Sequence, residues 1–129
     1  MSGFILSARS ISRLQGVHPD LVKVVEAAIQ STAIDFSVLE GLRSQKRQIE
    51  LFNAGASETL NSRHKTGHAV DLGVYVAGEI RWDWPLYDKL AIYVKAAAEK
   101  CNVPIEWGGD WRPERDGPHW QLPWQEYPK

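Results

Sequence analysis

The sequence has very little cysteine and no excess of charge of either sign. Its single cysteine, Cys101, excludes an internal disulfide and any cysteine-based zinc cluster. Lys and Arg number 15 and Asp and Glu number 16, which gives a formal net charge of -1. Because nucleic-acid binding depends on neutralising phosphates with basic side chains, we expect no nucleic-acid partner, and a metal-dependent nuclease is disfavoured for the same reason.

Long apolar runs are also missing from the chain. No stretch approaches the roughly 18 consecutive apolar residues that mark a membrane-spanning helix, so we expect no stable membrane association. The first residues, Met-Ser-Gly-Phe-Ile-Leu, lack the basic start and the longer apolar region of a signal peptide. The sequence therefore predicts a protein that stays in the cytoplasm where it is made until something else releases it.

Repeats, low-complexity segments and linkers are absent from the 129 residues. The length is that of one domain, and 43% hydrophobic residues suffice for a core that needs no disulfides. We therefore expect residues 1–129 to form one domain, without a separate cell-wall-binding domain, and to act as a monomer.

Hydrophobic periodicity and turn residues predict helices and short strands in alternation. Helices are expected to begin at Pro19, Ser44 and Pro85, where a proline or a capping side chain precedes apolar residues at helical spacing. Strands are expected at residues 34–39, 69–76, 79–82, 105–107 and 119–122. A short helix or a turn at residues 10–14 and a polar loop at residues 57–66 complete the pattern. The predicted fold class is α+β, a small, mostly antiparallel sheet with helices packed on it.

The strand at residues 69–76 places a carboxylate among small residues. Its alternation puts four apolar side chains on the core face, namely Val70, Leu72, Val74 and Val76. Asp71 then points to the opposite face, between Ala69 and Gly73, which leave room for a ligand to approach. An ordinary aspartate on a half-exposed strand is the alternative interpretation.

Histidine is scarce, and the chain contains only His18, His64, His68 and His119. His64 and His68 have the spacing of a helical zinc-binding pair, but Gly67 lies between them and no Glu follows His64, so this type of site is disfavoured. A better set combines His64, Asp71 and His119. Catalytic zinc takes three protein ligands of the His, Asp or Glu type and keeps a fourth position for water.

The segment Asp116-Gly117-Pro118-His119 predicts a tight turn that directs a carboxylate and an imidazole at one point. Asp116 is then a candidate general base beside the metal. Arg43, just before the helix that Ser44 caps, is a candidate to stabilise the oxyanion that forms during hydrolysis. The alternative for Arg43 is a solvated arginine at a helix start.

Residues 62–71, Ser-Arg-His-Lys-Thr-Gly-His-Ala-Val-Asp, resemble the SxHxxGxAxD motif of the zinc D-Ala-D-Ala carboxypeptidase and L-Ala-D-Glu endopeptidase family. This family includes VanY-like peptidases and phage endolysins, and the resemblance extends over roughly residues 10–122. It implies that His64 and Asp71 bind zinc. A later acid-x-x-His element implies Asp116 as base and His119 as third ligand, and the upstream Gly-x-Arg-Ser segment implies Arg43 as a substrate-side arginine.

Other residues are further candidates for contacts with the substrate. Gln48 falls where this family often has glutamine. Ser62 is a candidate to bind the substrate or to stabilise its loop, and His68 to line the cleft or to support the structure. Trp107 is a candidate wall of the substrate groove, with core packing as the alternative.

The resemblance implies zinc-dependent hydrolysis of the L-Ala–D-Glu bond in the peptidoglycan stem peptide. Asp116, where other members usually carry Glu, resembles the phage endopeptidase branch. Together with the missing signal peptide, this predicts an endolysin kept in the host cytoplasm until it reaches the periplasm, with a thin, Gram-negative-type wall as its target. A D-Ala-D-Ala carboxypeptidase or dipeptidase and a non-catalytic zinc-containing wall-binding domain are the alternatives. Asp116 and Arg43 argue against the second, because a structural zinc site needs no base.

Overall fold

An antiparallel sheet of five strands is the framework of the fold, which a computed structural model describes for residues 2–55 and 62–128. The central strand, β2 (Ala69–Val76), pairs with β1 (Phe36–Glu40) on one side and with β5 (His119–Gln121) on the other. The sheet is completed by β3 (Glu79–Arg81), which pairs with the end of β2, and β4 (Glu106–Trp107), which pairs with β5. The α+β class expected from the sequence is confirmed.

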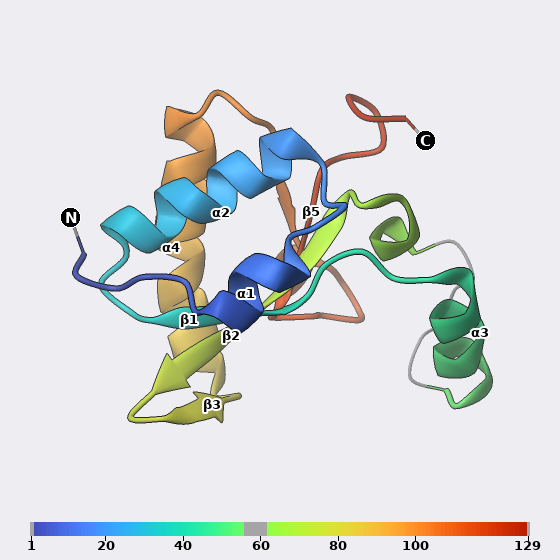
Figure 1. Cartoon of the computed structure of the whole chain (residues 1–129), viewed down its shortest axis with the longest axis horizontal. Coiled ribbons are helices and arrows are strands. Elements are labelled where there is room, and N and C mark those ends of the chain that lie inside the picture. Colours follow the sequence, from blue (N-terminus) through green and yellow to red (C-terminus); the bar gives the residue numbers. More distant parts are fainter. Residues whose placement is uncertain (1, 56–61, 129) are drawn as a thin grey trace.

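Two long helices supply most of the helical part of the core. In Figure 1, α2 (Pro19–Ser31) crosses α4 (Trp84–Lys100), and the two helices contact each other. Their apolar faces join the inward side chains of β1 and β2 in one cluster, as the helical spacing predicted. Removing this apolar surface from water stabilises the fold by about 25 cal/mol per Å².

The starts of three α-helices depend on polar side chains that accept hydrogen bonds from backbone N–H groups. Ser7 caps α1 (Ala8–Arg13), so the segment predicted at residues 10–14 as a short helix or a turn is a helix that begins two residues earlier. His18 caps α2 through Nδ1, which accepts from the Asp20 N–H at 3.0 Å. Ser44 caps α3 (Gln45–Asn53), as predicted, and accepts from the Arg47 N–H at 3.1 Å. Such caps satisfy donors that the helix itself leaves without partners.

The segment before β2 and the end of β2 differ from the sequence prediction. Part of the loop predicted at residues 57–66 lies outside the described residues, and its last residues form a 3₁₀ helix, η1 (Arg63–Thr66), instead of an irregular loop. Gly67 ends η1 with a φ of 78°, a conformation that glycine adopts without strain. The prediction that Val76 faces the core is wrong, because β2 there extends beyond β1 and Val76 is 38% exposed.

Within residues 2–55 and 62–128, no helix combines the length and the apolar character that crossing a membrane requires.

Candidate metal centre and its surroundings

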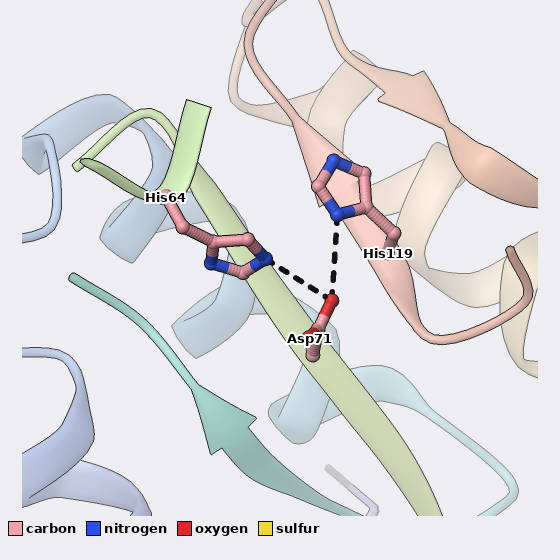
Figure 2. Close-up of side chains that lie close together, drawn as sticks. All are labelled: His64, Asp71 and His119. Carbon is pink, nitrogen blue, oxygen red and sulfur yellow. Dashed lines mark ion pairs between the residues drawn. The ribbon is translucent and has the colours of Figure 1, made fainter. Parts of the chain in front are cut away.

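The three side chains predicted as metal ligands converge on one point. His64 comes from η1, Asp71 from β2 and His119 from β5. His64 Nε2 lies 3.3 Å from Asp71 Oδ1, and His119 Nδ1 lies 3.4 Å from the same oxygen. Figure 2 shows both imidazoles directed at this carboxylate. One ligand atom from each of the three residues lies within 4.8 Å of the others, so the group can hold a metal ion.

The sheet register explains why two of these residues meet. Asp71 of β2 and His119 of β5 are direct partners in the antiparallel pair. Directly opposed residues project their side chains to the same face of a sheet. His64 lies outside this ladder and reaches the pair from η1, seven positions before Asp71 in the sequence.

Hydrogen bonds to carbonyl oxygens fix the orientation of both imidazoles. His64 Nδ1 lies 2.8 Å from the Gly41 carbonyl oxygen, which only accepts, so Nδ1 carries the proton. His119 Nε2 lies 2.8 Å from Gln121 Oε1 and donates to it in the same way. The lone pairs of His64 Nε2 and His119 Nδ1 therefore point toward Asp71. Metal-bound histidines typically show this arrangement, with the second ring nitrogen donating to a carbonyl or carboxylate.

This arrangement leaves buried acceptors without a donor. His64 Nε2 and Asp71 Oδ1 have no hydrogen-bond partner among the described residues. An unsatisfied buried polar atom costs about 1–3 kcal/mol. Three lone-pair donors that face one another are satisfied by a cation between them, and imidazole and carboxylate ligands suit divalent transition metals. The residues present thus fit a metal ion.

The charges of the cluster shift the pKa of Asp71 and of His119. Burial alone raises the pKa of Asp71, but contacts with His119 and His64 hold it well below its usual range. Burial alone lowers the pKa of His119, but the adjacent negative charge of Asp71 raises it overall. Asp71 therefore stays ionised, and a metal ion at this point would compete with a proton for His119 Nδ1.

Asp116 lies at the edge of the cluster, in the turn that leads into β5. Its N–H donates to the Gly108 carbonyl at 2.9 Å, and the His119 N–H donates to the Asp116 carbonyl at 3.3 Å. A Cβ on Gly108 would lie 2.4 Å from the Asp116 carbonyl oxygen, so only glycine permits this close approach. Loss of hydration and the negative charge of Asp71 raise the pKa of Asp116, against the opposing charges of His119, His64 and Arg43. A raised pKa suits a carboxylate that accepts protons.

Arg43 is anchored rather than solvated, with only 9% of its side chain exposed. Its Nε donates to Glu40 Oε2 at 3.0 Å, and its Nη2 pairs with Glu40 Oε1. Its Nη1 donates to Gln48 Oε1 at 2.7 Å. A register shift between Val38 and Glu40 brings Glu40 opposite Asp71 in the β1–β2 pair. This bulge places Glu40, the partner of Arg43, on the same face of the sheet as Asp71.

Four further residues were predicted to contact the substrate: Ser62, Gln48, His68 and Trp107. The structure shows what each of them contacts. Ser62 caps η1 and accepts from the His64 N–H at 3.2 Å, so it holds the turn that carries His64. Gln48 is completely buried against Arg43. His68 does not belong to the cluster, and its ring centroid lies 5.4 Å from that of His18. Trp107 is only 6% exposed. It supports the Asp116 turn from within the core, where its Nε1 donates to the Gly117 carbonyl, instead of lining an open groove.

Two side chains that contact the site were not found from the sequence. Gln121 stands two positions after His119 on β5, and this spacing on a strand indicates a shared face. Glu40 stands three positions before Arg43, but only the bulge, which the sequence pattern does not show, turns it toward Asp71. Both act on the site through residues that the sequence did predict.

Gln121→Leu is expected to weaken metal affinity about 10–100-fold, because His119 loses the acceptor that fixes its ring and its tautomer. The affinity is measured by competition with a chromophoric chelator. Gln121→Glu is the matched control, since it keeps an acceptor for His119 Nε2 and should bind metal at least as tightly as the unmodified protein. Equal affinity in the Leu variant would show that this hydrogen bond does not orient the ligand.

Comparison with known proteins shows the family of the chain. A family model described as phage L-alanyl-D-glutamate peptidase matches residues 1–121. The L-alanyl-D-glutamate peptidase of Escherichia phage T5 is 26% identical over 117 residues, which cover 88% of this chain and 85% of the relative. The endopeptidase CwlK of Bacillus subtilis, named for the same bond, is 31% identical over 124 residues, covering 82% of this chain and 73% of CwlK. The crystal structure of the Serratia marcescens L-Ala D-Glu endopeptidase ChiX superposes with a TM-score of 0.92 at 48% identity, over 98% of this chain and 96% of ChiX.

Proposed function

Because the chain belongs to the phage L-alanyl-D-glutamate peptidase family, we propose that it is a zinc-dependent endopeptidase that hydrolyses the L-Ala–D-Glu bond of the peptidoglycan stem peptide. The observation that carries this proposal is the convergence of His64, Asp71 and His119 on one point, with Asp116 at its edge. The names of the relatives from phage T5, B. subtilis and S. marcescens support the choice of bond.

His64, Asp71 and His119 are the residues that would hold the zinc. Two neutral imidazoles and one carboxylate make a three-ligand set, which is the set that catalytic zinc uses when a fourth position stays open. Bound zinc supplies Lewis-acid chemistry, which polarises an amide carbonyl and lowers the pKa of a water to about 7. The outer contacts with Gly41 and Gln121 keep the imidazole lone pairs directed at this position.

Asp116 is the proposed general base. Its carboxylate takes a proton from the attacking water and later delivers one to the amine nitrogen of D-Glu as the bond to L-Ala breaks. A positioned acid–base group contributes about 10²–10⁴ in rate. The raised pKa of Asp116, caused by lost hydration and by the charge of Asp71, makes this carboxylate a stronger base than an ordinary aspartate.

Arg43 is the proposed stabiliser of negative charge on the substrate. A guanidinium has five N–H donors, and the bonds to Glu40 and Gln48 use three of them. The remaining donors can face the oxyanion of the cleavage step or a carboxylate of D-Glu. Because the guanidinium is fixed in advance, it needs no reorganisation as charge develops.

Glu40→Gln is expected to lower kcat/KM about 10–100-fold, because Arg43 loses its bidentate partner and shifts from the position that the reaction requires. Zinc content should not change. Glu50→Gln, the same substitution at an exposed position of the nearby helix α3, is the matched control and should keep full activity. An unchanged kcat/KM in Glu40→Gln would mean that Arg43 needs no anchor to act.

The proposed biological role is that of a phage endolysin, acting as a monomer. It would remain in the host cytoplasm until it is released to a thin, Gram-negative-type cell wall. The phage family and the phage T5 relative support this role.

Two synthetic peptides test the choice of bond. One carries L-Ala linked to D-Glu, and the other ends in D-Ala-D-Ala. We expect zinc-dependent cleavage of the first peptide only. Release of D-Ala from the second peptide without cleavage of the first would establish the carboxypeptidase alternative, and cleavage of neither would favour a wall-binding domain.

A further inference from the structure

Arg63, the residue before His64, is a buried arginine whose side chain binds backbone carbonyls. It is only 2% exposed. Its Nε and one terminal nitrogen donate to the Leu122 carbonyl at 3.2 and 2.9 Å, and the same terminal nitrogen donates to the Tyr127 carbonyl at 2.6 Å. Burying a charged guanidinium costs free energy unless it is hydrogen-bonded, so these contacts indicate a specific structural role for Arg63.

The contacts of Arg63 join two parts of the metal centre that the sheet does not join. Asp71 and His119 are held together by the β2–β5 ladder, whereas His64 stands outside it, on η1. Leu122, which accepts from Arg63, directly follows β5, the strand that carries His119. The guanidinium therefore ties the turn with His64 to the strand with His119.

Backbone bonds around Arg63 reinforce this connection. The Arg63 carbonyl accepts from the His68 N–H at 3.0 Å, and the His68 carbonyl accepts from the Leu122 N–H at 2.9 Å. The Arg63 side chain and this pair of backbone bonds thus connect η1 with the end of β5. A rotation of η1 that moved His64 would break several of these bonds together.

The C-terminal segment, residues 123–128, packs against the Arg63 guanidinium. The Trp124 ring lies 4.0 Å from the guanidinium carbon, in cation–π geometry. The Tyr127 hydroxyl donates to Asp20 Oδ2 at 2.6 Å, which ties this segment to the start of α2, and the bond raises the pKa of Tyr127 to about 12. Figure 1 shows the segment in red, beyond β5. It follows the residues that the family model matches, 1–121.

We propose that Arg63 is a positioning residue of the metal centre and that residues 123–128 hold its side chain in place. Arg63 sets the place of His64 relative to Asp71 and His119, and Trp124 and the Tyr127 carbonyl hold Arg63. This inference rests on the proposed zinc site. It assigns to Arg63 an effect on metal affinity, which is separable from an effect on folding alone.

Arg63→Lys tests the inference, because lysine keeps the positive charge but cannot bind the Leu122 and Tyr127 carbonyls through a planar fork. We expect zinc affinity to fall about 10–100-fold, as for other residues that orient metal ligands. Affinity is measured with Zn²⁺ against a chelator. The visible spectrum of the Co²⁺-loaded protein, which depends on ligand geometry, should change as well. Urea unfolding of the metal-free protein is measured in parallel.

Tyr127→Phe is the matched control. It removes the hydroxyl that binds Asp20 but keeps the Tyr127 carbonyl that binds Arg63. Metal-free Tyr127→Phe should unfold at a lower urea concentration, yet bind Zn²⁺ as tightly as the unmodified protein. The two variants thus separate stability from positioning.

Unchanged Zn²⁺ affinity in folded Arg63→Lys would overturn the proposal, even if the variant were less stable. If Arg63→Lys does not fold, the full-length variant Trp124→Ala decides instead. It lacks the ring that packs on the Arg63 guanidinium, so its Zn²⁺ affinity should fall, and an unchanged affinity would overturn the proposal. Absence of Zn²⁺ binding by the unmodified protein would instead refute the proposed metal site, and this inference with it.

Discussion

Asp116→Asn is expected to reduce hydrolysis by about 10²–10⁴ while leaving the metal in place, because the amide cannot accept the proton of the attacking water. The backbone contacts of Asp116 with Gly108 and His119 do not depend on its carboxylate, so the turn should keep its shape. The measurements are kcat/KM on the L-Ala–D-Glu peptide and the zinc content of the purified protein.

Asp110→Asn is the matched control for this variant. Asp110 is an exposed acid nearby in the sequence, and its carboxylate pairs with Lys95 at 2.8 Å. The control should retain both activity and zinc. Loss of zinc from Asp116→Asn would identify Asp116 as a metal ligand and refute its role as the base.

His119→Ala is expected to lose both metal and activity. The substitution removes one of the three proposed ligands and breaks the hydrogen bond with Gln121, and it leaves Asp71 without its nearest partner on β5. Zinc binding, measured by competition with a chelator, should fall by several orders of magnitude, and hydrolysis should become undetectable.

His68→Ala is the control for a general effect of removing a histidine. Its ring packs near His18 and lies 6.4 Å from the Tyr127 ring. This variant should bind zinc normally and keep its activity, with at most a loss of stability. Normal zinc content in His119→Ala would remove His119 from the metal site.

The convergence of His64, Asp71 and His119 was predictable because these residues follow from short-range patterns. The alternation of β2 predicts the face of Asp71, and the Asp116-Gly117-Pro118 turn predicts where His119 begins the next strand. The antiparallel register between β2 and β5 then brings Asp71 and His119 opposite each other. A motif with fixed spacing before β2 adds His64, and the structure brings these three residues together.

The residues that support the cluster were not predictable in the same way. Glu40 reaches the site through a bulge, and a single inserted residue in a strand leaves no clear mark on the alternation pattern. Arg63 acts through carbonyls 59 and 64 positions away, and backbone acceptors carry no signal of residue type. Val76 was misplaced because alternation predicts which side a residue faces, but not whether a neighbour covers it. Long-range contacts, rather than local pattern, decide these positions.

The most direct test of the proposed function is mass spectrometry of purified peptidoglycan incubated with the protein, with and without a chelator. We predict glycan strands that keep a single L-Ala, together with free peptides that begin at D-Glu. These products should disappear with the chelator and return when Zn²⁺ is added back. Loss of terminal D-Ala alone, or cleavage that the chelator does not affect, would contradict the assignment of the chain as a zinc-dependent L-Ala–D-Glu endopeptidase.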